Sequence, residues 1–127
     1  MDKYLEKQQR LAALKGWSNV TILDGQIASV AVSGEISYPP IPRWVFDNAA
    51  ALHLMVEHKL NPMRVDDTRP FFVVDGIYGA SLAIVFFDEH GNDAYAALRY
   101  ALVCAAIRQL EIARIVLAAT QPPALAA

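Results

Sequence analysis

The segment HLMVEH, residues 53 to 58, carries two imidazoles and a carboxylate, the groups that commonly bind zinc or transfer protons in enzymes. His53 and Glu57 stand four residues apart, so they share one face of a helix. His58 points about 140° away from His53 on that helix, so the three side chains close on one metal only with help from another element. A hydrogen-bonded or solvated pair of His53 and Glu57 is the commoner meaning of this spacing.

A second polar stretch is the segment DEHGND, residues 88 to 93, in which Asp88, Glu89 and His90 could bind a cation or act as acid and base. The stretch lacks the ligand pattern and the distal bidentate glutamate of a calcium loop. A polar turn before a helix needs the same residue types for capping, and this is the role we expect. The loop VDDTR, residues 65 to 69, could bring further acids to the same end of a sheet.

Other chemistry-bearing residues have simpler explanations. Cys104, the only cysteine, lies in an apolar stretch, where a thiol packs as a small hydrophobic group and forms no intramolecular disulfide. Pro39 and Pro42 have the PxxP spacing, which a stiff loop inside a domain also explains. Glycine-rich phosphate loops, GxSxG and paired CxxC motifs do not occur in the sequence. We therefore predict no cofactor and no resident metal.

Length and composition favour one compact domain without an electrostatic partner. The 127 residues suffice for a single core, and 55% hydrophobic against 19% charged residues indicates extensive burial. The net charge of −2 and the absence of blocks of like charge argue against nucleic acid or anionic membranes as partners. The N-terminal sequence MDKYLEKQQR lacks the apolar core of a secretory signal, so we expect an intracellular protein.

Periodicity and end signals predict three helices. The first runs from residue 2 to residue 15, and the second runs from residue 44 to about residue 60, where Asn61-Pro62 ends it. The third follows the DEHGND turn. The apolar side of the second helix that we expect to be buried consists of Val45, Ala49, Leu52, Val56 and Leu60.

Two Asp-Gly pairs predict type I′ turns, and therefore two β-hairpins. Asp24-Gly25 joins VTIL to QIASVAVS, and Asp75-Gly76 joins FFVV to IYGASLAIVFF. The segments 71–74 and 82–87 are apolar at both sets of alternating positions, so the second hairpin needs cover on both faces.

The expected fold is a single α+β domain over residues 1 to 120, with a tail over residues 121 to 127 that is flexible. Helix-sheet-helix layers surround one four-stranded, mainly antiparallel sheet. The expected order of elements is α-β-β-α-β-β-α.

Two segments together resemble a known family. PPIPRWVFDNAAALHLMVEH combines a Pro-x-Trp entry, a short acidic step and an Ala/Leu-rich helix, and DEHGNDAYAALRYALVCAAIRQLE opens its helix with an acidic residue and continues through an Ala-rich stretch with an arginine. They resemble the phage alpha-beta-alpha sandwich domain, a group of small proteins encoded by phages or prophages. The matching positions in the last helix are Asp93, Ala96, Ala97, Arg99, Ala105 and Ala106. The resemblance implies a layered fold, a phage or prophage origin and the cytoplasm of a bacterial host, and it carries no activity and no functional residue.

The last helix is apolar over more of its surface than one contact layer requires. Its charges stand at only four positions, Arg99, Arg108, Glu111 and Arg114, which are still too many for a membrane span. We expect its N-terminal half to face the core and its C-terminal half to pack against a second copy of the chain. The predicted interface consists of Leu110, Ile112, Ile115 and Val116.

These observations favour a small phage-derived accessory protein that binds another protein without catalysis. A homodimer is the first partner expected, and a phage or host protein is the second. The alternative is a small metal-assisted or acid-base enzyme that uses His53, Glu57 and the loop 88–93. The alternative requires these side chains to converge.

Overall fold

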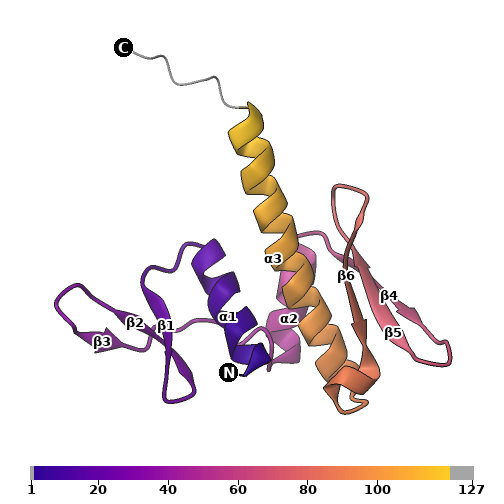
Figure 1. The fold of residues 1–127 in the computed structure, drawn as a ribbon, viewed down its shortest axis with the longest axis horizontal. Helices are drawn as coiled ribbons and strands as arrows, with labels where there is room; N and C mark the ends of the chain where they lie inside the picture. The colour runs from indigo at the N-terminus through magenta and orange to yellow at the C-terminus, as the bar shows by residue number, and fades with distance from the viewer. Residues whose placement is uncertain (1, 121–127) are drawn as a thin grey trace.

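The computed structural model describes residues 2 to 120, which form a single α+β domain of three α-helices and two three-stranded antiparallel sheets (Figure 1). The helices are α1 (Lys3–Leu14), α2 (Asn48–Glu57) and α3 (Ala94–Thr120), and a 3₁₀ turn, η1 (Phe87–His90), precedes α3. The strands are β1 (Val20–Leu23), β2 (Gln26–Val30), β3 (Ile36–Ser37), β4 (Asn61–Val65), β5 (Phe71–Asp75) and β6 (Ser81–Phe86). The tail predicted for residues 121 to 127 lies outside the described residues.

The N-terminal elements form where the sequence predicts them. The Asp2 carboxylate caps α1 by accepting a hydrogen bond of 2.8 Å from the Tyr4 N–H. Asp24 and Gly25 have φ values of 49° and 74°, as a type I′ turn between β1 and β2 requires. The predicted first hairpin is therefore confirmed, while β3, with only two residues, was not predicted.

The second helix is shorter than predicted, and the face expected to be buried is wrong. Asp47 caps α2 by accepting a hydrogen bond of 3.0 Å from the Ala49 N–H, so the helix begins at Asn48. Val45 and Leu60 of the predicted apolar side are buried but lie outside α2. Leu52 and Val56 are 52% and 73% exposed, whereas Ala51 and Leu54 are buried. The stretch AAALHLMV is apolar on most of its surface, so its periodicity does not select one face.

Asn61 and Pro62, which were expected only to end the second helix, begin β4 instead. β4 pairs with β5 from Asn61 opposite Asp75 to Val65 opposite Phe71, and it is an edge strand, where a proline without an N–H is tolerated. With β4 and β3 added, the strands divide into two sheets of order β1-β2-β3 and β4-β5-β6. The predicted single four-stranded sheet is therefore wrong.

The turn predicted at Asp75-Gly76 is wrong as well. Asp75 belongs to β5 and pairs with Ser81, so the connection to β6 is the longer loop 76–80. A Cβ atom at position 76 would collide with the side chains of Gln109 and Leu82. Glycine is needed at this position for close approach to α3, and not for a left-handed backbone.

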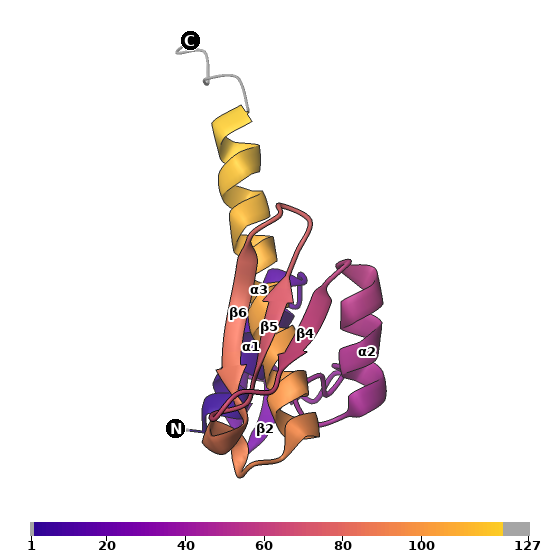
Figure 2. The ribbon, with the colours of Figure 1, turned by 90° about the vertical axis from the view of Figure 1, so that its right-hand side faces the viewer.

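The helix α3 is the centre of the molecule, because α1, α2 and the sheet β4-β5-β6 all pack against it (Figure 2). Small side chains allow this approach on several sides. The buried residues of α3 are Ala97, Ala101, Leu102, Val103, Ala105, Ala106, Ile107 and Gln109. The sheet contributes Phe72, Val74 and Val85 to the same core.

The opposite face of the sheet β4-β5-β6 is not covered by a helix in the described part of the chain, and in Figure 2 it faces the viewer. Met63 and Ile84 on this face are 53% and 57% exposed. Phe71 and Phe86 shield each other at a ring distance of 5.1 Å, and Arg69 lies over the Phe86 ring. The expectation of helices on both faces is wrong, because these partly buried aromatic rings take the place of a second layer.

Candidate functional site

His53 and His58 both lie beside Glu57, and Lys15 contacts Glu57 and His58. The Glu57 carboxylate lies 3.5 Å from the His53 ring and 3.3 Å from the His58 ring. It also accepts a hydrogen bond from the Lys15 ammonium at the end of α1. This bond is the main reason why the pKa of Glu57 is lowered, while burial and the neighbouring Lys15 lower the pKa of His58. The cluster joins the ends of α1 and α2, and its carboxylate is already paired with the Lys15 ammonium.

Asp88 and Glu89 belong to a second, separate cluster. The guanidinium of Arg69 donates two hydrogen bonds to the Asp88 carboxylate, at 2.6 and 2.9 Å, and lies 3.6 Å from Glu89. The hydrogen bond from Arg69 is the main cause that lowers the pKa of Asp88. Arg69 comes from the VDDTR loop, so this loop contributes a cation that ties β5 to η1.

His90 lies in a third place and is 7% exposed. Its Nδ1 atom is 2.7 Å from the Tyr4 hydroxyl, and its ring lies 4.6 Å from the Tyr100 ring. Burial lowers the pKa of His90, so the neutral ring is favoured. The contact anchors the start of α1 to η1, with Lys3 donating a further hydrogen bond of 2.8 Å to the Glu89 carbonyl.

The residues required by the enzyme alternative stand at opposite ends of the sheet β4-β5-β6. α2 ends just before Asn61, which pairs with Asp75, whereas η1 follows Phe86, which pairs with Phe71 (Figure 2). The five residues of β5 separate these ends by about 13 Å. Among residues 2 to 120, no group of three or more histidine, cysteine, aspartate or glutamate side chains is arranged to hold a metal.

Cys104 is partly buried and poorly suited to act as a nucleophile. Burial in α3 raises the pKa of its thiol, so the thiolate is disfavoured. The neighbouring Tyr100 is partly buried, and desolvation raises its pKa to about 12. Both side chains serve the core between α1 and α3.

The C-terminal half of α3 presents a different kind of surface. Buried positions end at Gln109, and α3 continues past the rest of the domain (Figure 1). Ile115, Val116 and Leu117 are 65%, 44% and 59% exposed. Of the four residues predicted as an interface, Leu110 packs against the core, Ile112 is half-buried, and Ile115 and Val116 are exposed.

The loop 76–80 between β5 and β6 lies towards the same end of the molecule (Figure 2). The Ile77 N–H donates a hydrogen bond of 3.0 Å to Oε1 of Gln109, which fixes the loop beside α3. Ile77 and Tyr78 are 57% and 44% exposed. We call Ile77, Tyr78, Ile115, Val116 and Leu117 the apical patch. Its loop residues were missed, because the predicted two-residue turn left no loop there.

Comparisons with protein family models, with curated proteins and with solved structures find no match to this chain. The resemblance to the phage alpha-beta-alpha sandwich domain is not tested by them and stays a prediction. No helix within residues 2 to 120 combines the length and apolar character needed to cross a membrane.

Proposed function

We propose that the protein is a non-catalytic protein-binding module whose first partner is a second copy of itself, bound through the apical patch. The observation that carries the proposal is the apolar exposure of α3 beyond Gln109. Residues 110 to 113 of α3 are half-buried, and all residues from Arg114 to Thr120 are exposed.

The exposed part of α3 continues the face that packs against the core lower down. Ile112, Ala113 and Val116 follow the buried Gln109 by three, four and seven residues, so they lie on its side of the helix. The charged residues Arg108, Glu111 and Arg114 lie on other sides of the helix, and Glu111 is 3.8 Å from Arg10 of α1. Ile115 follows Glu111 by four residues, so it lies on the same side as this carboxylate. Within the described residues, the exposed apolar surface therefore extends around the helix from Ile115 through Val116 to Leu117, and Val116 continues the buried side.

The size of the patch favours a weak, reversible dimer. Burying the exposed part of one such side chain contributes about 1 kcal/mol, and a twofold contact buries the five side chains of each copy. Association costs at least about 4 kcal/mol in lost freedom of motion. The difference corresponds to a dissociation constant in the range of about 10 to 100 μM.

The proposal also includes a role as an accessory protein of a phage or prophage in the bacterial cytoplasm, with a phage or host protein as further partner. This part rests on the family resemblance. Genes encoded beside the reading frame test it, since a small binding module takes its role from its context.

Sedimentation equilibrium tests the dimer. The wild type is expected to rise from 14.0 kDa towards twice that mass over about 5 μM to 1 mM. The double variant Val116→Asp with Leu117→Asp is expected to remain a monomer. The matched control Val32→Asp with Ile36→Asp changes Val32 in the turn between β2 and β3 and Ile36 in β3, which are 104% and 53% exposed, and is expected to dimerise like the wild type. A wild type that stays monomeric throughout, or a control that dissociates equally, contradicts the proposal.

A further inference from the structure

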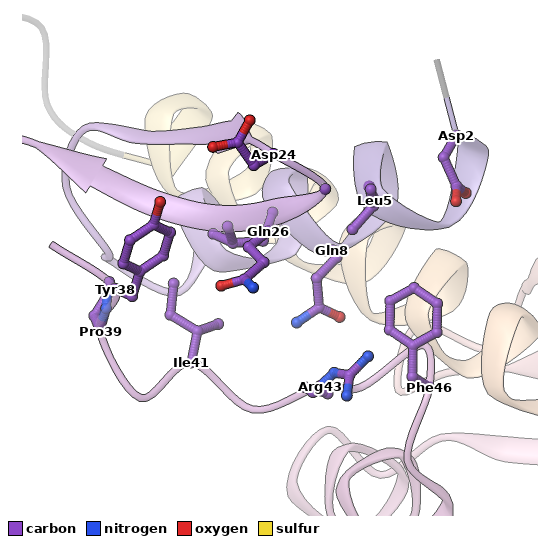
Figure 3. A pocket seen from close by; sticks show the side chains of 12 residues that line it. Asp2, Leu5, Gln8, Asp24, Gln26, Tyr38, Pro39, Ile41, Arg43 and Phe46 are labelled. Atoms are coloured by element: carbon purple, nitrogen blue, oxygen red, sulfur yellow. The ribbon is translucent and has the colours of Figure 1, made fainter. Parts of the chain in front are cut away.

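A pocket of about 720 Å³ lies between α1, the β1–β2 hairpin and the segment 38–46 (Figure 3). Its lining combines the apolar side chains of Leu5, Ile27 and Ile41 with the polar groups of Gln26 and Arg43. The volume is in the range of pockets that bind small molecules or short peptides. The pocket is built from the N-terminal sheet, so it is distinct from the apical patch.

One wall of the pocket is a strand edge that β3 leaves unpaired. β3 pairs only at two positions, Ser37 with Ser29 and Ile36 with Val30. Continuing the same register would place Pro39 opposite Ile27. Pro39 has no N–H, and its carbonyl accepts a hydrogen bond of 2.7 Å from Ile41, so the chain turns away from β2.

The backbone of Ile27 points into the space left by this departure. The Val30 N–H donates to the Asn19 carbonyl on the β1 side, at 3.2 Å, and the Ala31 N–H donates to the Glu35 carbonyl on the β3 side, at 2.9 Å. Peptide groups alternate in direction along a strand. Ile27, four residues before Ala31, therefore directs its N–H and its carbonyl towards the β3 side.

A cation stands on the opposite wall. Gln8 is 3% exposed, donates to the Pro42 carbonyl and accepts from the Val45 N–H at 3.3 Å, so it fixes the backbone on both sides of Arg43. The Arg43 guanidinium lies 5.0 Å from the centre of the Phe46 ring, and it has no ion pair within residues 2 to 120. Figure 3 shows Arg43 reaching towards Gln8 from the lower segment.

Two carboxylates also line the pocket, and neither occupies Arg43. The Asp2 carboxylate is engaged in capping α1 through the Tyr4 N–H. Asp24 belongs to the hairpin turn and lies on the far side of β2 from Arg43 in Figure 3. The guanidinium is therefore the charge available to a ligand bound between β2 and the segment 38–46.

We propose that this pocket binds a short extended peptide segment of a partner protein that carries a carboxylate side chain. The peptide backbone pairs with the N–H and carbonyl of Ile27 as an added strand, and the carboxylate pairs with Arg43. Apolar side chains on the other positions of the peptide contact Leu5 and Ile41. This binding does not require the dimer proposed above.

A titration followed by ¹H–¹⁵N NMR tests the proposal, with the acetylated and amidated pentapeptide TVEVT as the probe. Binding at about 1 mM or tighter is expected, with the Ile27 amide among the signals that shift most. The peptide TVQVT, which lacks the charge, is expected to bind about five-fold more weakly. An unchanged Ile27 signal at about 5 mM peptide, or equal affinity for both peptides, overturns the proposal.

Two variants separate the contributions. Arg43→Gln is expected to reduce the affinity for TVEVT to that for TVQVT, while Arg108→Gln on α3 leaves both unchanged. The double variant Pro39→Val with Pro40→Thr restores N–H groups opposite β2, so β3 extends, the Ile27 amide becomes protected from exchange and TVEVT no longer binds. Unchanged affinity in the Arg43 variant contradicts the proposal even if the proline variant does not fold.

The monomeric variant of Val116 and Leu117 is expected to bind TVEVT like the wild type, which keeps this test independent of self-association.

Discussion

Replacing Gln109 by alanine is expected to destabilise the domain by about 2 to 3 kcal/mol, although the residue lies in a long apolar helix. The side chain is 5% exposed and joins three elements. Its Oε1 accepts from the Ile77 N–H at 3.0 Å, and its Nε2 donates to the His58 carbonyl at 2.6 Å. Gln109 therefore ties α3 to the loop after β5 and to the end of α2.

The size of this loss of stability follows from the backbone groups that lose their hydrogen-bond partner. Truncation to alanine removes partners from one N–H and one carbonyl, each at a cost of about 1 kcal/mol where water has partial access, and it leaves a small void in the packing. In a domain of this size the loss corresponds to a decrease in Tm of roughly 6 to 12 °C. Urea denaturation at about 1 μM protein, well below the dissociation constant proposed for the dimer, measures the free energy of unfolding of the monomer.

Two further variants check the reasoning. Gln109→Glu keeps the acceptor for the Ile77 N–H but places a carboxylate beside the His58 carbonyl, which raises the pKa of the new glutamate. The variant is less stable than the wild type at neutral pH. The difference in the free energy of unfolding shrinks as the pH falls, because the protonated acid can donate to the His58 carbonyl. Arg108→Ala, at the exposed neighbouring position, is expected to change stability by less than about 0.5 kcal/mol. A Gln109→Ala protein as stable as Arg108→Ala would refute the assignment of Gln109 as the residue that joins these elements.

Four other outcomes are expected. Gly76→Ala lowers the free energy of unfolding, because the new Cβ collides with the Gln109 side chain. The loss is expected to be smaller in the Gln109→Ala protein, and equal losses in a double-mutant cycle contradict this reason. Asp47→Ala lowers stability by about 1 kcal/mol, because it removes the cap of α2, whereas the control Asn48→Ala keeps that cap. If the two variants have the same denaturation curve, the observed start of the helix is contradicted. Stability falls as the pH drops below 6.5, because the pKa values of His58 and His90 are lowered in the folded state and the unfolded state takes up protons first. The double variant His58→Gln with His90→Gln is expected to show a smaller loss of stability below this pH. Arg69→Gln returns the pKa of Asp88 towards its ordinary value, which an NMR titration of the carboxyl detects; an unchanged pKa rejects the ion pair as its cause.

The features that sequence predicted correctly are set by local chemistry. The turn at Asp24-Gly25 needs two residues that tolerate positive φ, and the cap at Asp2 needs a carboxylate before a helical stretch. The third helix is long and has strong end signals, so its existence was equally readable. Each of these depends on a few neighbouring residues.

The errors concern features that depend on distant residues. The Asp75-Gly76 pair has the sequence of a tight turn, but the glycine serves the approach of Gln109, which is 33 positions further along the chain. β4 carries a proline and no clear alternation, and its pairing with β5 alone makes it a strand. The division into two sheets follows from such pairings, which local patterns do not encode.

The contacts of the candidate polar residues were also predictable only where they are local in the sequence. His53 and Glu57 meet as their spacing predicts, because helical geometry alone brings them together. Lys15 and Arg69, which neutralise Glu57 and Asp88, come from other elements. Their presence turns two candidate reactive clusters into contacts that hold the fold together.

Hydrogen exchange measured by mass spectrometry at two protein concentrations tests the central claim most directly. Peptides that cover residues 110 to 120 are expected to exchange rapidly at about 1 μM and several-fold more slowly at about 500 μM, where the dimer dominates, while peptides from β1 and β2 exchange equally at both. Exchange of the segment 110–120 that does not depend on concentration would contradict the assignment of the apical patch as the self-association surface.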